Sequence, residues 1–210
     1  MIKLLGKVPR NSYIAVSGGS DSMAALDFLH NGGRRNLVAL HFNHGTEHAD
    51  KAESLVRSFC LENEIPAVFG KISEEVPKGS SKEDFWRKQR YSFFNKVTSS
   101  NYDYGPVITC HHLDDAVETW LFTSLHGNPK IIPPKRGPYI RPFLLTNKES
   151  LTNWCLKRSV PYVFDPSNND TKYMRNYIRH NIVPLTKNIN PGLNKVIKKK
   201  ILASFSEENN

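Results

Sequence analysis

The sequence contains no long apolar run. No stretch approaches the roughly 18 to 20 apolar residues that cross a bilayer, and the first ten residues are too weakly apolar for a secretory signal. Internal repeats and low-complexity tracts are absent as well. These absences argue against a membrane protein and lead us to expect a cytoplasmic location.

Cysteine is also scarce. Cys60, Cys110 and Cys155 are odd in number and far apart in the sequence, which is typical of free thiols in a reducing compartment. No Cys-x-x-Cys pair exists, so an iron–sulfur cluster or a zinc ribbon has no obvious ligands.

The sequence does contain enough apolar residues for the core of one domain, and it carries an excess of positive charge. The 210 residues are 39% apolar and 23% charged, with a net charge of +9, which supports a packed core in a single domain. The charge predicts a polyanionic partner, and a solvated basic helix accounts for it equally well. Much of the excess lies in the last third of the chain, at Lys172, Arg175, Arg179, Lys187, Lys195, Lys198, Lys199 and Lys200.

Segments with strand and helix periodicity alternate along the chain. We expect strands at 12–16, 37–42, 66–70 and 107–110, and helices from 21 and at 49–64, 81–99 and 113–125. This alternation is typical of an α/β protein with a doubly wound parallel sheet. After residue 127, prolines and glycines predict an irregular loop. We then expect helices at 147–158, 173–182 and 193–203, with a short strand at 162–164 and a turn at 165–169.

The strongest local signal is Ser17-Gly18-Gly19-Ser20-Asp21-Ser22, between the first strand and the first helix. The glycines let the backbone approach a ligand, and the hydroxyls and free amides of the first helical turn offer donors to phosphate oxygens. Asp21 would repel phosphate unless a cation intervened, which makes it a natural Mg²⁺ ligand. The run is neither a Walker A loop nor a Gly-x-Gly-x-x-Gly fingerprint. The plainer interpretation is a Gly-Ser turn with an ordinary helix cap.

A second cluster, Cys-His-His-Leu-Asp-Asp-Ala-Val-Glu-Thr at 110–119, follows the fourth strand. In a parallel sheet it lies at the same carboxyl edge as the 17–22 loop, where ligands bind. Asp115 and Glu118 share a helix face, and acids packed together are costly unless they hold a metal or a cationic group. An acidic first turn that complements the helix dipole explains one or two acids, but not the two histidines as well.

Two further blocks are basic. Arg87 and Arg90 lie one helical turn apart and could reach a phosphate or a polarised carbonyl, although basic residues on a helix are usually solvated. The segment 165–170 is followed by Arg175-Asn-Tyr-Ile-Arg179-His. Taken alone, that is a turn capping a basic helix.

In their order, these blocks resemble the tRNA(Ile)-lysidine synthetase family of PP-loop ATP pyrophosphatases. The matching blocks are the 17–22 loop, His-x-x-His-Gly at 41–45, the Arg-x-x-Arg-Tyr helix at 87–91, His-His-x-Asp-Asp-x-x-Glu-Thr at 111–119, Arg-Pro-Phe-Leu at 141–144, Asp-Pro-Ser-Asn-x-Asp at 165–170 and Arg-Asn-x-x-Arg at 175–179. A loop of this kind fits any member of the wider superfamily. The joint presence of the acidic block and the last basic block narrows the resemblance to this family.

The resemblance implies a Rossmann-like fold of the adenine nucleotide alpha hydrolase type. It implies a PP-loop domain at 1–145 and, in the same domain, a basic helical segment at 146–210 that faces RNA. The activity implied is that of a ligase, which uses ATP and Mg²⁺ to adenylate the 2-carbonyl of an anticodon cytidine and then joins free L-lysine to it. The RNA implied is the minor isoleucine tRNA with a CAU anticodon, and a homodimer is left open.

The resemblance also assigns roles to single residues. It implies ATP contacts from Ser17, Gly18, Gly19, Ser20, Asp21, Ser22, His41 and His111, and a metal ion on Asp21 with Asp114 and Asp115. Asp115 and Glu118, which have no obvious basic partner nearby in the sequence, would hold the ammonium group of lysine. Arg87 or Arg90 would stabilise charge on the α-phosphate, so that Asp21, Arg87, Arg90, Asp115 and Glu118 form the catalytic set. RNA phosphates would contact Arg175, Arg179, Lys198, Lys199 and Lys200.

The chain departs from the family pattern at Thr46-Glu47, at 126–129, at Trp86 and at Cys110. Its 210 residues leave no room for the C-terminal tRNA-binding domains of many members, and we therefore expect a short form. Two alternatives stay open: a PP-loop enzyme with another nucleobase or amine as substrate, and a protein that binds nucleotide or RNA without turnover. Base thiolation is disfavoured because no cysteine pair is present to relay sulfur.

Overall fold

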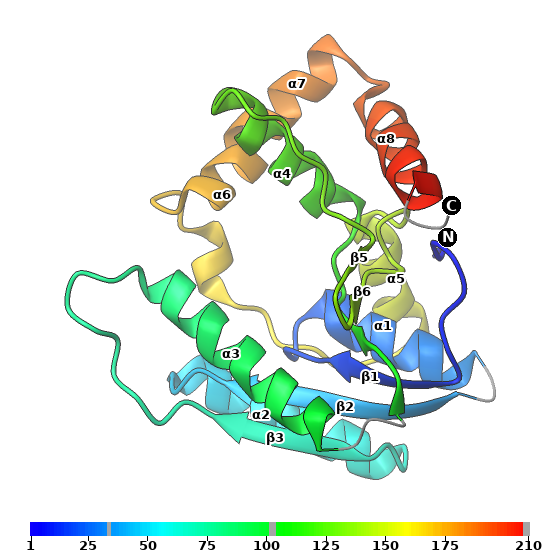
Figure 1. The fold of residues 1–210 in the computed structure, drawn as a ribbon, viewed down its shortest axis with the longest axis vertical. Coiled ribbons are helices and arrows are strands. Elements are labelled where there is room, and N and C mark those ends of the chain that lie inside the picture. The colour runs from blue at the N-terminus through cyan, green and yellow to red at the C-terminus, as the bar shows by residue number, and fades with distance from the viewer. Residues whose placement is uncertain (33–34, 101–103, 208–210) are drawn as a thin grey trace.

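The computed structural model describes residues 1–32, 35–100 and 104–207. Its centre is a six-stranded sheet in the order β3-β2-β1-β4-β6-β5 (Figure 1). Neighbouring strands are parallel except β5 and β6, which form an antiparallel hairpin. The strands are β1 (Asn11–Ala15), β2 (Asn36–Asn43), β3 (Ala67–Lys71), β4 (Val107–Ile108), β5 (Lys135–Arg136) and β6 (Tyr139–Ile140). The predicted α/β class with a mostly parallel sheet is confirmed.

Helices follow the strands and continue beyond the sheet. They are α1 (Ser20–Asn31), α2 (Glu47–Glu62), α3 (Lys82–Ser99), α4 (Leu113–Leu125), α5 (Lys148–Arg158), α6 (Met174–Tyr177), α7 (Val183–Ile189) and α8 (Leu193–Glu207). A 3₁₀ turn, η2 (Pro166–Asn169), precedes α6, and a π-helical turn, η3 (Ile178–Ile182), joins α6 to α7. Within the described ranges, none of the helices combines the length and the apolar character that crossing a membrane requires.

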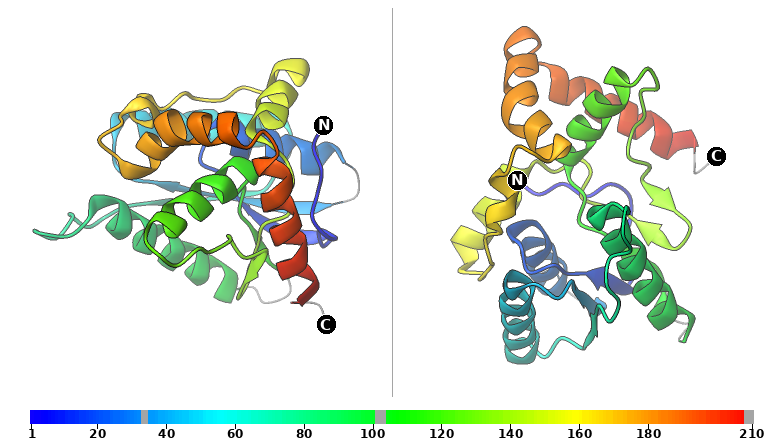
Figure 2. Two further views of the ribbon diagram at one scale, coloured as in Figure 1. Left: turned by 90° about the horizontal axis from the view of Figure 1, so that it is seen from above. Right: turned by 90° about the vertical axis from the view of Figure 1, so that its left-hand side faces the viewer.

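Alternating side chains along β1 explain why helices cover both faces of the sheet. Ile14 belongs to one apolar cluster with residues of α1, α2 and α5, whereas its neighbour Tyr13 packs with Phe94 of α3. Successive strand side chains point to opposite faces. The helices α1, α2 and α5 therefore lie on one side of the sheet and α3 on the other (Figures 1 and 2).

A separate apolar cluster holds the C-terminal helices against α4. Leu113 and Val117 of α4 pack with Ile178 of η3 and Ile197 of α8. The N-terminal segment joins this cluster through Leu5, whose backbone N–H donates to the carbonyl of Pro142 at 2.7 Å. Helix α4 consequently connects the sheet to the C-terminal helices, and residues at its start can reach both.

Two predictions about the connecting segments are wrong. The segment 162–164 is not a strand: it is held by the Val163 N–H, which donates to the carbonyl of Gly18 at 2.9 Å, and the 17–22 loop offers no strand edge for a longer ladder. The loop after residue 127 is not wholly irregular, because β5 and β6 form a hairpin there. Gly137 at its tip has φ +57°, which glycine adopts without strain.

The helix predicted at 173–182 also differs from the structure. It passes through α6 and η3 into α7 and ends at Ile189. Pro184 does not stop it, because it lies in the first turn of α7, where a backbone N–H is not needed. The wider π-helical turn comes directly before this proline.

Candidate active site

The 17–22 loop leaves the carboxyl end of β1 and is closed by its own serines. Gly18 has φ +87°, and a Cβ there would meet the Cβ of Ala52 at 3.0 Å, so the position favours glycine on both counts. The Ser22 hydroxyl accepts from the Ser17 N–H at 3.1 Å and donates to the Gly19 carbonyl at 3.0 Å. The loop is therefore a tight, internally bonded turn.

Its amides are left open toward a ligand. Gly19 is the N-cap of α1 and supplies no side-chain cap, so the first N–H groups of this helix have no partner within the helix. Unpaired amides at the positive end of a helix dipole form a binding surface for phosphate. The loop thus has the donors and the shape of an anion cradle.

Asp21 lies in the first turn of α1 beside this cradle. Its Oδ2 is 3.5 Å from Nε2 of His112 and 3.4 Å from Nζ of Lys148. Burial opposes the charged form, but the hydrogen bond and charge of His112, together with Lys148, hold the pKa of Asp21 below its usual value. The carboxylate is therefore ionised and still partly accessible, with 27% of its side chain exposed.

His112 is a central residue of the site that our sequence analysis left without a role. It lies at the N-cap of α4, where its Nδ1 is 3.3 Å from the backbone nitrogen of Asp115 and Asp115 Oδ2 accepts from the His112 N–H at 2.9 Å. The ring is 2% exposed. Burial lowers its pKa, but Asp115, Asp21 and Asp114 outweigh that effect and raise it to about 9. The signal that could have revealed this role is the spacing of His112 and Asp115, which matches a capping box.

Asp114 and Asp115 carry structural bonds as well as charge. Asp114 Oδ2 accepts from the backbone N–H of Lys148 at 2.8 Å and thereby fixes the start of α5.

In the part of the chain that is described, no three His, Cys, Asp or Glu side chains form a ready metal site. Mg²⁺ rarely uses such a cage, since it is usually bound by one or two carboxylates and substrate phosphates. The carboxylate of Asp21 beside the open amides fits that mode.

Glu118 has a partner that the sequence analysis did not anticipate. Arg179 donates to it twice, from Nε at 2.6 Å and from an Nη at 2.9 Å. Glu118 is 5% exposed, and burial raises its pKa although Arg179 opposes the rise. The sequence shows no basic partner for these acids nearby in the chain, and the structure supplies a distant one for Glu118. The two residues are 61 positions apart and meet only because η3 packs on α4.

The segment 160–170 links α6 and η3 to the 17–22 loop. Besides the Val163–Gly18 bond, Asn176 of α6 donates to the carbonyls of Ser167 and Asp170 at 2.8 and 2.9 Å. His180 Nε2 lies 3.0 Å from the carbonyl of Asn168. Asn176 is 9% exposed, so the block at 175–179 positions this turn as well as presenting charge.

Comparisons with known proteins identify the family. The profile of the PP-loop domain family matches residues 2–186. The chain belongs to the PP-loop domain family. The tRNA(Ile)-lysidine synthase of Bacillus subtilis is 32% identical over 211 residues, which cover 93% of this chain and 44% of that protein. The Bifunctional protein TilS/HprT of Listeria innocua is 34% identical over 212 residues, covering 93% of this chain and 32% of that protein.

The similarity to tRNA(Ile)-lysidine synthetases expected from the motifs is thus confirmed, and the chain spans about a third to a half of the length of these curated relatives. Among solved structures, the U34-tRNA thiolase NcsA of Methanococcus maripaludis, with its [4Fe-4S] cluster, superposes with a TM-score of 0.77. The match covers 97% of this chain and 76% of that one at 16% identity, which shows a shared fold.

His41 lies on β2, beside the residue that precedes the 17–22 loop (the PP-loop), and His44 directly follows that strand. His41 Nδ1 is 2.9 Å from the Val16 carbonyl. Within residues 1–32, 35–100 and 104–207, its Nε2 is buried without a hydrogen-bond partner, and burial lowers its pKa. His44, to which we gave no role, stacks on Trp86 with ring centroids 5.0 Å apart. Its Nδ1 is also buried, and no residue in the described part of the chain hydrogen-bonds to it. Burial, with the charges of Arg90 and His41, lowers its pKa to about 4.

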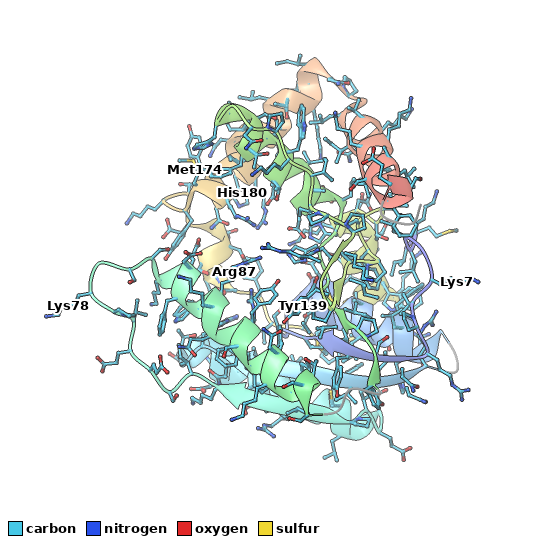
Figure 3. All side chains as sticks on the ribbon, viewed as in Figure 1. Lys7, Lys78, Arg87, Tyr139, Met174 and His180 are labelled. Carbon is cyan, nitrogen blue, oxygen red and sulfur yellow. The ribbon has the colours of Figure 1, made fainter. Side chains whose placement is uncertain are left out.

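The remaining predicted residues lie after β4, on α3 and on α8. His111 follows β4 beside the acids, and burial lowers its pKa to about 4. Arg87 is an exposed residue of α3 and faces the space toward α4 and α6 (Figure 3), while Arg90 is more enclosed. Lys198, Lys199 and Lys200 lie on α8, which packs on α4 at the side away from α3 and α6 (Figure 1). The structure does not bring these lysines to the PP-loop.

Proposed function

We propose that this protein is an ATP-dependent tRNA-modifying ligase of the tRNA(Ile)-lysidine synthetase type. Its reaction adenylates the 2-carbonyl oxygen of the anticodon cytidine of the minor isoleucine tRNA, and then joins the ε-amine of free lysine to that carbon with release of AMP. The observation that carries this proposal is the meeting of Asp21 in the PP-loop with His112 and the acids of α4. This places an anion cradle and a cluster of carboxylates side by side.

The residues of the loop fit the phosphates of ATP. The open amides at the start of α1 and the hydroxyls of Ser17 and Ser20 are donors for phosphate oxygens. Bound Mg²⁺ would supply positive charge between Asp21 and those oxygens. Asp21 carries the negative charge for this contact, because His112 and Lys148 favour its ionised form.

The acids of α4 are suited to bind an amine, although Arg179 already pairs with one of them, Glu118. A free lysine brings two ammonium groups and one carboxylate. Asp115 Oδ1 is 3.9 Å from Arg179, whereas Glu118 makes two short hydrogen bonds to it. We therefore assign to Asp115 the closest contact with an ammonium group. Glu118 supports that contact through its charge, and Arg179 is placed to face the lysine carboxylate.

Arg179 is consequently a weaker candidate for an RNA phosphate contact than Arg175, which is exposed on α6. Arg87 or Arg90 remains the candidate for charge on the α-phosphate. We place the protein in the cytoplasm, where ATP, lysine and tRNA are available, and the homodimer stays open.

The deciding experiment is mass spectrometry of tRNA from cells that express the chain. A lysine-sized addition to cytidine in the minor isoleucine tRNA supports the proposal, and the Asp21→Ala variant should not produce it. Sulfur on a nucleobase instead would identify a thiolase. Against that outcome, Cys60, Cys110 and Cys155 are free thiols on α2, after β4 and on α5.

A further inference from the structure

A pocket separate from the PP-loop lies between α3 and the β5–β6 hairpin. Its volume is about 410 Å³, within the range of roughly 300 to 1,000 Å³ that is usual for small-molecule sites. No residue of the 17–22 loop lines it. The lining residues are Asp84, Arg87, Lys88, Tyr91, Arg136, Gly137, Tyr139 and Arg141.

The pocket is strongly cationic. Arg87, Lys88, Arg136 and Arg141 face a single carboxylate, Asp84. Among the described residues, none of these four cations forms an ion pair with an acid. Like charges gathered without counter-charges repel one another, and a bound anion would relieve that repulsion.

Arg141 gives independent support for a ligand. The residue is 5% exposed, and one Nη donates to the Pro133 carbonyl at 2.7 Å. Its Nε is buried and has no hydrogen-bond partner among the described residues. A buried donor left unpaired costs free energy, and since Arg141 lines the pocket, an acceptor bound there that reached this nitrogen would remove that cost.

Aromatic rings from both α3 and the hairpin also line the pocket. Tyr91 and Tyr139 meet edge to face with centroids 4.8 Å apart, and the guanidinium of Arg87 lies 5.0 Å from the Tyr91 centroid. Figure 3 shows Arg87 and Tyr139 on opposite sides, from α3 and from the hairpin. Aromatic rings and arginine planes together are the surfaces on which unstacked RNA bases rest.

The pocket adjoins the proposed centre of the reaction. Arg141 directly follows β6, whose Ile140 carbonyl accepts from the Thr109 N–H at 3.0 Å. The hydroxyl of Thr109 lies 3.0 Å from Nδ1 of His111, which directly precedes His112 and the acids of α4. An RNA nucleotide held in the pocket therefore lies next to the site where the base reacts.

We infer that this pocket binds a phosphate-bearing nucleotide of the RNA substrate, with the phosphate on Arg136 and Arg141 and the base or ribose on the tyrosines. The inference rests on the proposed function, in which RNA is the substrate. A free mononucleotide carries the same chemistry, so the test must separate the two sources.

The variant Arg136→Glu reverses one exposed charge of the pocket on the hairpin. Lys135→Glu is its matched control, because Lys135 is the preceding residue, is equally exposed and does not line this pocket. The probe is a labelled CAU anticodon stem–loop, measured by fluorescence anisotropy, with ATP affinity measured in parallel. We expect Arg136→Glu to weaken RNA binding tenfold or more, Lys135→Glu to weaken it less than threefold, and ATP affinity to change in neither.

Equal losses of RNA binding in the two variants would reduce the effect to general surface charge and overturn the inference. A loss of ATP or AMP affinity in Arg136→Glu, with RNA binding intact, would assign the pocket to a free nucleotide and overturn it as well. A different result would contradict the proposed function and leave the pocket inference intact. If the wild-type chain binds the stem–loop with the expected dependence on Arg136 but never adds lysine to cytidine, the pocket stands and the ligase assignment falls.

Discussion

The guanidinium of Arg179 binds both carboxylate oxygens of Glu118 and joins η3 to α4. The two hydrogen bonds, at 2.6 and 2.9 Å, form a bidentate pair that is shielded from solvent because Glu118 is 5% exposed. The position at which we expected a substrate ammonium group thus already has a protein cation beside it. This pair couples the acids of the proposed amine site to the helix that carries Arg175.

The first prediction concerns Glu118→Gln, which keeps the shape of the side chain and removes its charge. We expect the apparent KM for lysine to rise about ten- to a hundredfold, because the change weakens the charge-assisted pair with Arg179 and removes the charge that supports the ammonium contact at Asp115. RNA-dependent ATP–pyrophosphate exchange should persist, because the first step does not need the amine. Steady-state kinetics with lysine as the varied substrate, beside the exchange assay, measure both effects.

Arg179→Lys is the matched variant for the same pair. It keeps the positive charge but cannot make two parallel hydrogen bonds. A rise in lysine KM in both variants, with thermal unfolding shifted by a few degrees at most, fits an amine site held in place by the pair. If Glu118→Gln instead abolished pyrophosphate exchange and left the dependence on lysine unchanged, Glu118 would belong to the ATP site.

The second prediction is that Asp21→Ala abolishes adenylation while the fold stays intact. Asp21 is partly accessible, and its partners His112 and Lys148 hold it ionised next to the open amides of α1. Pyrophosphate exchange with RNA should fall to background, whereas circular dichroism and the unfolding temperature should match those of Glu62→Ala, an exposed acid on α2. Wild-type ATP consumption in Asp21→Ala would remove this residue from the ATP site.

The third prediction links His44 to stability at acid pH. Its ring lies between Phe42 and Trp86, with Arg90 and His41 nearby, and its pKa is about 4. An unfolded chain takes up this proton near pH 6.5, while the folded chain resists it until about pH 4. Stability from His44 is therefore full above pH 6.5 and is lost as the pH falls toward 4, by on the order of 1–3 kcal/mol.

The variant His44→Phe keeps an aromatic ring on Trp86 and removes the titration. Urea unfolding at pH 7.5 and pH 4.5 should show a smaller loss of unfolding free energy in His44→Phe than in the wild-type chain. A loss of equal size in both would mean that folding does not lower the pKa of His44, and the prediction would be wrong.

The sequence predicts the parts of the site that are local and leaves out those that depend on packing. Loop 17–22 and the acids of α4 follow a strand and open a helix, so periodicity and spacing place them at one edge of the sheet. The Arg179–Glu118 pair joins residues 61 positions apart, and no periodicity shows which basic residue η3 will bring to α4. The hairpin β5–β6 is equally hidden, because two residues per strand are too few to show alternation, and the pocket between it and α3 remains hidden with it.

The fourth prediction decides what the basic end of the chain does. Lys198, Lys199 and Lys200 are consecutive on α8, and the last two are exposed. The helix lies at the side of α4 away from the PP-loop, so these lysines contribute to RNA binding only if the RNA extends over that side. Changing all three to Gln should then weaken tRNA binding and reduce the log–log salt slope by roughly one unit for each RNA phosphate that is no longer neutralised.

A control variant with Lys3, Lys78 and Lys157 changed to Gln removes the same charge from three exposed positions scattered over the chain. Titrations of full-length tRNA and of the anticodon stem–loop at several salt concentrations provide the measurement. A slope that falls for full-length tRNA alone would place the body of the tRNA on α8, and slopes equal to those of the control would leave α8 as a solvated surface.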